Sequence, residues 1–149
     1  MKEECKLCSQ MKRITPKGKL VNLKGELYCN DCAKKVIDLS VKMTTTQNID
    51  GYRVKCYIGV ESVEIVMGTG FISEFATEWQ DVFGARSTDF EIKLQKAKET
   101  AISKLKYLTF EKGGDAIIGT DIDYTEFSGN RIGLIVNGTI VELERIDKI

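Results

Sequence analysis

The chain has 149 residues, five cysteines and no histidine. Without histidine it can build neither a Ser-His-Asp or Cys-His nucleophile nor an HExxH zinc site, so any soft-metal site must consist of thiolates. Lysine plus arginine and aspartate plus glutamate number 22 each, which makes the formal charge zero. The length allows one ordinary domain, or a small module followed by a medium-sized domain.

The first residues, MKEECKLC, are followed by no apolar run, so we expect no secretory signal. Nowhere do the roughly 18 apolar residues of a membrane helix run together. We therefore expect a cytoplasmic protein with no membrane segment. Thiols stay reduced in that compartment, so paired cysteines there suggest a metal before a disulfide.

The zero net charge is the sum of opposite charges on two unequal parts of the chain. Residues 1–42 hold ten Lys+Arg and five Asp+Glu, a charge of +5, whereas residues 43–149 hold twelve and seventeen, a charge of −5. Four of the five cysteines also fall in the first part. We predict two modules, 1–42 and 43–149. The charges are consistent with mutual attraction, with an acidic partner for the basic part, or simply with two solvated surfaces.

The cysteines of the first module form two CxxC pairs, Cys5 with Cys8 and Cys29 with Cys32. Twenty residues separate the pairs, which matches the spacing of four-cysteine zinc sites. Two thiolates on a tight turn reach one ion at about 2.3 Å, and a second pair completes the tetrahedron. The alternatives are unliganded thiols or a redox motif, but a redox motif needs only one CxxC. The spacing predicts one structural Zn²⁺ per chain.

The residues between and after the pairs are typical of a treble-clef or LIM-like zinc finger. Residues 18–23 and 26–28 are expected to form two short strands around a turn at Lys24 and Gly25, and residues 33–39 a helix. Some 40 residues bury too little core to fold alone, so a metal is physically required. A closed four-thiolate site has no open coordination position, so we expect a structural role for it.

Nucleic acid is not the partner that this module favours. With zinc bound its charge is about +3, and several lysines are available to phosphates. Tyr28 is the module's only aromatic residue, however, so no stacking platform is visible. A protein-facing or purely structural finger fits better.

The second module begins with residues that alternate between apolar and polar. Residues 52–58 and 60–67 are expected to be two strands that pair, with Gly59 between them. Cys56 alternates with Val54 and Ile58, which favours a thiol in the core. Residues 71–83 suggest an amphipathic helix whose aromatic stripe lies in the core or a subunit interface, or else lines a ligand pocket.

Residues 89–111 give the clearest helical pattern. One apolar stripe runs through Phe90, Leu94, Ala97, Ala101, Leu105 and Leu108. Thr88 and Glu91 form a capping box at its start, and Gly113-Gly114 supplies the stop. Residues 115–124 are expected to be a strand, and 131–146 a long strand or a bent pair with a bulge or close backbone approach at Gly138. This order predicts an α+β fold with helices on one face of a mostly antiparallel sheet.

Two groups of polar residues are candidate ligand sites. Asp121 and Asp123 share one face of a strand, where they could bind a hard cation or divide acid and base roles, or simply be solvated. Arg86 and Ser87, in a glycine turn before the long helix, could hold an anion, or merely cap the helix. The sequence contains no nucleophile with a base, no P-loop and no GxGxxG, which favours a non-enzymatic protein.

A set of short motifs in the second module recurs together in a known family. They are Thr44-Thr45-Thr46, Gly51-Tyr52, Gly59-Val60, Gly68-Thr69, Gly84-Ala85-Arg86-Ser87, Gly114-Asp115-Ala116-Ile117-Ile118-Gly119, Asp121-Ile122-Asp123-Tyr124 and Gly138-Thr139. In this order they resemble the YbjQ-like family over about residues 43–143. The resemblance implies an α+β subunit that assembles into a ring, typically a pentamer. The family's description as heavy-metal-binding also implies that it binds metal.

These observations lead to one main expectation and two alternatives. We expect a non-enzymatic, zinc-binding oligomer that serves in binding or scaffolding, with its fingers presented together so that weak contacts with a protein partner become avid. The first alternative is a small-ligand or metal-ion binding protein, in metal handling or stress, that uses Arg86, Ser87, Asp121 and Asp123. An enzyme that uses the paired carboxylates remains a third possibility.

Overall fold

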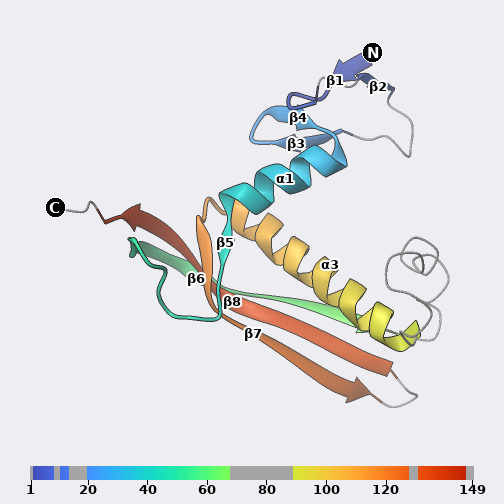
Figure 1. Ribbon diagram of the computed structural model, residues 1–149, viewed down its shortest axis with the longest axis vertical. Helices are drawn as coiled ribbons and strands as arrows, with labels where there is room; N and C mark the ends of the chain where they lie inside the picture. The colour runs from blue at the N-terminus through green and yellow to red at the C-terminus, as the bar shows by residue number, and fades with distance from the viewer. Residues whose placement is uncertain (1, 9–10, 14–19, 68–88, 128–130, 147–149) are drawn as a thin grey trace.

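The computed structural model describes residues 2–8, 11–13, 20–67, 89–127 and 131–146 (Figure 1). The helix expected at 71–83, the capping Thr88, and the candidate residues Arg86 and Ser87 lie outside these ranges. Within the described ranges, no helix is both long and apolar enough to cross a membrane.

The N-terminal module, by which we mean residues 2–8, 11–13 and 20–40, contains two small hairpins and a helix. Strands β1 (Lys2–Glu4) and β2 (Met11–Arg13) pair antiparallel, as do β3 (Val21–Leu23) and β4 (Glu26–Tyr28). Lys24 and Gly25 both have positive φ, 51° and 89°, as a tight two-residue hairpin turn requires. Helix α1 (Asn30–Ser40) follows. The second hairpin and the helix were predicted, whereas β1 and β2 were not.

The rest of the described chain forms one four-stranded sheet with a helix across it. The strand order is β5 (Lys42–Met43), β7 (Ala116–Phe127), β8 (Arg131–Arg145), β6 (Tyr52–Met67). The β5–β7 pair is parallel and the other two are antiparallel. Helix α3 (Asp89–Glu111) lies along one face of this sheet (Figure 1). The predicted α+β class is confirmed.

The expectation of two pairing strands around Gly59 is wrong. Residues 52–67 form the single strand β6, which pairs with β8 along its whole length, from Tyr52 opposite Arg145 to Met67 opposite Ile132. The register shifts between Val54 and Cys56 and again between Tyr57 and Gly59. A bulge bends and twists a strand without ending it, so the glycine marks an irregularity inside the strand and not a turn.

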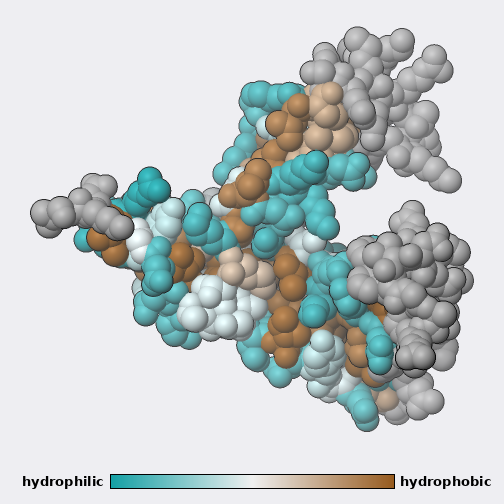
Figure 2. Space-filling view, viewed as in Figure 1, coloured by the Kyte–Doolittle hydropathy of each residue, from teal (hydrophilic) through white to brown (hydrophobic). Residues whose placement is uncertain are grey.

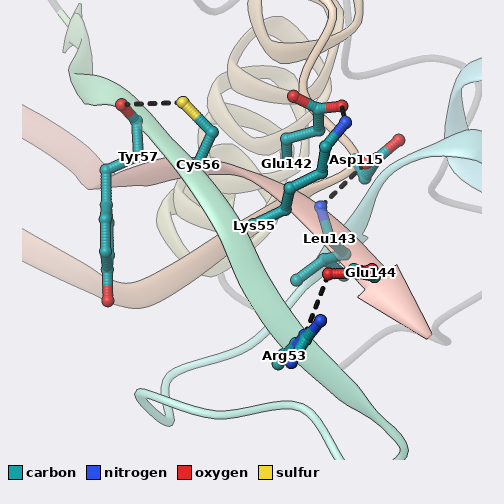
Figure 3. A network of polar contacts seen from close by, with 8 residues as sticks. All are labelled: Arg53, Lys55, Cys56, Tyr57, Asp115, Glu142, Leu143 and Glu144. Carbon is teal, nitrogen blue, oxygen red and sulfur yellow. Dashed lines mark hydrogen bonds and ion pairs between the residues drawn. The ribbon is translucent and has the colours of Figure 1, made fainter. Parts of the chain in front are cut away.

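Cys56 is exposed, so its predicted place in the core is also wrong. The register shift just before it breaks the period of two on which that prediction relied. Figure 3 shows this part of β6, where the Cys56 Sγ lies 3.7 Å from the Tyr57 carbonyl oxygen. Cross-strand ion pairs hold β6 to β8 here: Arg53 with Glu144 at 2.9 Å and Lys55 with Glu142 at 2.6 Å.

The core lies between α3 and the sheet. The predicted helical stripe is confirmed over its described side chains, because Ala97, Ala101 and Leu105 are fully buried and the two other leucines pack against the same cluster. The predicted close approach at Gly138 is confirmed too, since a Cβ there would come within 2.5 Å of the Ile117 Cγ2 atom. On the opposite face a second, smaller cluster centres on Ala116, Ile118 and Val141, where Ile49 and Val54 pack against it.

The N-terminal module packs on α3. The main apolar cluster continues from α3 through Val41 and Ile37 to the buried cysteines. Lys106 Nζ lies 3.1 Å from the Asp38 carboxylate, and Lys24 Nζ lies 4.4 Å from the centre of the Phe110 ring. In the space-filling view, hydrophobic residues appear on both the N-terminal part and the helix-covered part of this face (Figure 2). The module is therefore docked against the helix at several points.

Candidate metal centre

Four elements bring the two cysteine pairs to one place. Cys5 directly follows β1, and Cys8 lies three residues further along in a turn. Cys29 links β4 to α1, with extended backbone at the helix N-cap, and Cys32 occupies the first turn of that helix. The Lys6 N–H donates to the Leu27 carbonyl at 2.9 Å, which fixes the first pair beside β4.

The sulfur atoms have the spacing of a tetrahedral site. All four Sγ atoms lie within 4.8 Å of one another, and the Cys8 and Cys29 sulfurs are 3.8 Å apart. Metal–sulfur bonds of about 2.3 Å make the edge of a regular tetrahedron about 3.8 Å. Among the described residues, this is the one group of three or more cysteines, aspartates and glutamates close enough to hold a metal ion.

Two of the four thiols have pKa values that shift in opposite directions. Cys5, Cys29 and Cys32 are buried, whereas Cys8 is exposed. Hydrogen bonding from the Cys29 backbone, with help from the backbones of Cys8 and Leu7, lowers the pKa of Cys5 to about 6 against the opposing effect of burial. The Cys29 thiol, followed by burial and the Cys8 thiol, raises the pKa of Cys32 to about 12.

The close approach of the four thiols has a consequence for their charge. Four thiolates so close together repel one another, so protons must remain on some of them unless a cation is present. A bound divalent cation deprotonates its thiol ligands and balances half of their charge. The N-terminus of α1, next to Cys29 and Cys32, also favours negative charge. The donor set therefore fits a soft divalent cation.

Neighbouring polar side chains brace the cluster in a way that the sequence did not reveal. Lys6 pairs with the Glu26 carboxylate, and the Tyr28 hydroxyl donates to the other Glu26 oxygen at 2.6 Å. Lys6 lies between the two cysteines of the first pair, and Glu26 lies in β4, the strand that leads to the second pair. The ion pair therefore links the two segments that carry the cysteines. No sequence signal marks this contact, because residues 20 positions apart meet only after the hairpin has folded.

The predicted carboxylate pair lies elsewhere, on β7. Asp121 and Asp123 are both exposed and share a face, opposite Asn137 and Ile135 of β8. Asp121 hydrogen-bonds to the Asp123 carboxyl and repels its charge, which raises the pKa of Asp123. Arg86 and Ser87, the other predicted ligand residues, lie outside the described residues.

Known proteins resemble residues 41–144 of this chain. A family model described as "Putative heavy-metal-binding" (YbjQ) matches those residues. The UPF0145 protein of Acetivibrio thermocellus is 39% identical over 104 residues, which are 68% of this chain and 98% of the relative. UPF0145 proteins of Bacillus thuringiensis subsp. konkukian and Bacillus cereus are each 33% identical over 101 residues, again 68% of this chain and 98% of each relative.

A solved structure matches a similar share of this chain. A protein of unknown function from Pediococcus pentosaceus, assigned to the DUF74 family, aligns with 20% identity and a TM-score of 0.46 over 70% of this chain and 98% of that one. All four clustered cysteines precede residue 41, where the family match begins. The cluster is therefore an addition to the shared unit, and Cys56 is the one cysteine within that unit.

Proposed function

Because this chain belongs to the YbjQ family through residues 41–144, and carries a four-thiolate cluster outside them, we propose that it is a non-enzymatic zinc-binding scaffold protein. Zinc would be held by Cys5, Cys8, Cys29 and Cys32 and would stabilise the N-terminal module. The family unit would supply the oligomer. The names of the family and of its relatives state no enzymatic activity.

The observation that carries the zinc assignment is the sulfur geometry. All-thiolate sets select soft or borderline cations, and a tetrahedral set of four is typical of structural Zn²⁺. Such a site leaves no coordination position for substrate or water, so its contribution is to folding. In the reducing cytoplasm, where we place the protein, the thiols would remain available to the metal.

We also propose that the family unit self-associates through β6. Among the strands that the structure describes, β6 lies at an edge of the sheet, with β8 as its one neighbour. Tyr57 and Val60 are 69% and 73% exposed, and Val66 is exposed as well. Long edge strands with exposed apolar side chains pair readily with another chain. A second copy would cover them and bring several N-terminal modules together, available to a protein partner.

Zinc content and native mass, measured on the same sample, test this proposal. We expect one zinc per chain by elemental analysis and a mass several times that of the chain by native mass spectrometry. Val60→Lys should lower the native mass, whereas Leu39→Lys, at an 84% exposed position on α1, should leave it unchanged. A metal-free monomer would refute the proposal.

The paired carboxylates favour a second candidate function, the binding of a hard cation or small ligand by the family unit. Asp121 and Asp123 face the same way, and the raised pKa of Asp123 shows that their charges are close enough to interact. A cation between them would relieve this repulsion. In a thermal-shift screen with divalent ions, a stabilisation abolished by Asp121→Asn would support this function. The absence of any shift beyond that of zinc would count against it.

A further inference from the structure

We propose that a hollow between α1 and α3 binds a small phosphate-bearing anion. The hollow has a volume of about 320 Å³ and lies where the N-terminal module meets the helix of the family unit. Its cations and hydroxyls are Lys34, Lys96, Lys104, Thr100, Ser103 and Tyr107. Figure 2 shows a notch between the two parts of the molecule, bordered by hydrophilic residues.

The charge of this hollow is positive. Three lysines and a single acid, Glu99, line it, so its formal charge is +2 by subtraction. The Glu99 carboxylate accepts a hydrogen bond of 3.3 Å from the Gln95 side chain, which does not line the hollow. An ammonium group acts as a compact point charge that suits phosphate oxygens from several directions.

Two of the lysines have no ion-pair partner among the described residues. Elsewhere in the described residues, lysines form ion pairs, such as Lys106 with Asp38 and Lys112 with Glu61. Within the same part of the chain, no carboxylate pairs with Lys34 or Lys104. Cations that outnumber the acids of a concave site attract an anionic ligand.

The hydroxyl groups come from the same face of α3 as Lys96 and Lys104. Positions 96, 100, 103, 104 and 107 recur at helical spacing, so their side chains project to one side. Thr100 Oγ1 donates to the Lys96 carbonyl at 2.8 Å, and Ser103 and Tyr107 line the hollow beside it. Lys34 approaches from α1 on the opposite wall.

The size and the borders of the hollow favour a small ligand over a nucleic acid strand. Its volume is at the lower end of small-molecule sites, which run from about 300 to 1,000 Å³. The Asp38–Lys106 ion pair joins the two helices beside it, and Glu99 places a negative charge within it. A polyanionic strand would require a continuous basic track, and these two acids interrupt one.

Calorimetry of the full-length, zinc-loaded protein with inorganic pyrophosphate tests this inference. Saturable binding that weakens as salt rises is expected. Lys104→Gln and Lys34→Gln should each lower the affinity by about tenfold or more, as expected for the loss of a charge-assisted hydrogen bond. The matched controls are Lys35→Gln on α1 and Lys98→Gln on α3, which do not line the hollow and should change affinity less than about twofold.

The remaining outcomes decide against the proposal. Absence of pyrophosphate binding would overturn it, as would an equal effect of Lys34→Gln and Lys35→Gln, since that would indicate diffuse surface charge. Binding of a single-stranded oligonucleotide without binding of pyrophosphate would assign the surface to nucleic acid instead. Zinc content and native mass are measured on each variant. A variant that keeps both but does not bind pyrophosphate would contradict the anion site alone and leave the proposed zinc-binding oligomer unaffected. If Lys34→Gln disturbs the nearby metal site, Lys104→Gln on α3 decides alone.

Discussion

At the level of single residues, the four-cysteine cluster is unevenly shielded from water. Cys5, Cys29 and Cys32 are at most 6% exposed, whereas Cys8 faces solvent. A buried ligand has no replacement when it is removed, because water reaches its position poorly. An exposed one can be replaced by a solvent molecule. The four ligands should therefore not contribute equally to metal affinity.

We accordingly predict that Cys29→Ser abolishes zinc binding, whereas Cys8→Ser retains a weaker site. The loss of zinc affinity in Cys29→Ser should be larger than the roughly 10–100-fold loss seen when a residue that only hydrogen-bonds to a metal ligand is removed. Competition with a chromophoric chelator measures both affinities. Cys56→Ser is the matched control, because this exposed thiol lies in the family unit, and it should bind zinc like the unchanged protein. A substantial effect of Cys56→Ser would contradict the four-ligand assignment.

The carboxylate pair on β7 gives a prediction on pH. The neighbouring Asp121 raises the pKa of Asp123, so the folded state holds that proton more tightly than the unfolded state does. The associated stability is present below the ordinary aspartate pKa and is lost as pH rises through the raised value. Asp121→Asn removes the repulsion, so the variant should gain stability relative to the unchanged protein as pH rises across this window.

Two measurements check this expectation. Carboxyl NMR titration should show the pKa of Asp123 falling in Asp121→Asn, and urea unfolding at acid and neutral pH should show the relative gain. Glu126→Gln, an exposed change on the same strand, is the control and should leave the titration of Asp123 in place. An unchanged Asp123 titration in Asp121→Asn would remove the physical basis of a carboxylate site.

At the level of elements, β8 depends on a glycine where it packs closely against β7. A Cβ at Gly138 would lie 2.5 Å from the Ile117 Cγ2 atom, and Ile117 is fully buried. Gly138→Ala should therefore destabilise the protein by about 1–3 kcal/mol, the usual cost of overpacking. Urea unfolding measures this. Ser62→Ala, at an exposed position on the adjacent strand β6, should stay within about 0.5 kcal/mol.

Elements governed by local rules could be predicted from the sequence. Helix α3 follows from its apolar stripe, and the β3–β4 hairpin from the turn at Lys24 and Gly25. The cysteine cluster could be predicted for a similar reason, because metal geometry requires a fixed spacing within each pair. Local patterns were enough in all three cases.

Elements that depend on distant contacts could not be predicted. Strand β5 has two residues and exists because β7 pairs with it, and β1 and β2 are short and mostly charged. The bulges near Cys56 shift the register against β8, so alternation along β6 alone misassigned the exposure of that thiol. The lysine-lined hollow requires the packing of α1 on α3, which neither helix encodes alone.

At the level of the whole molecule, an added module is joined to a family unit by a shared apolar surface. The buried cluster runs from the cysteines through Ile37 and Val41 to Leu105. Contacts of Asp38 with Lys106 and of Lys24 with Phe110 reinforce this junction. The sheet, however, has a second buried cluster of its own, formed by Ala116, Ile118 and Val141.

We therefore predict that metal removal unfolds the N-terminal module before the sheet. Structural zinc contributes about 10–16 kcal/mol of apparent binding free energy in small metal-dependent folds, and the module has little other core. Hydrogen exchange after chelation should show the amides of α1 losing protection while those of β8 retain it. Restored protection on adding zinc back is the control. Simultaneous loss in β8 would show instead that the two parts fold as one cooperative unit.

X-ray absorption at the zinc edge tests whether four thiolates hold one zinc ion in this protein. Applied to the purified, unmodified protein, the measurement reports the type, number and distance of the atoms bound to zinc. A four-thiolate zinc site requires four sulfur atoms at about 2.3 Å and no lighter ligand. A first shell that contains nitrogen or oxygen, or a protein that carries no zinc after purification with its thiols reduced, would contradict it.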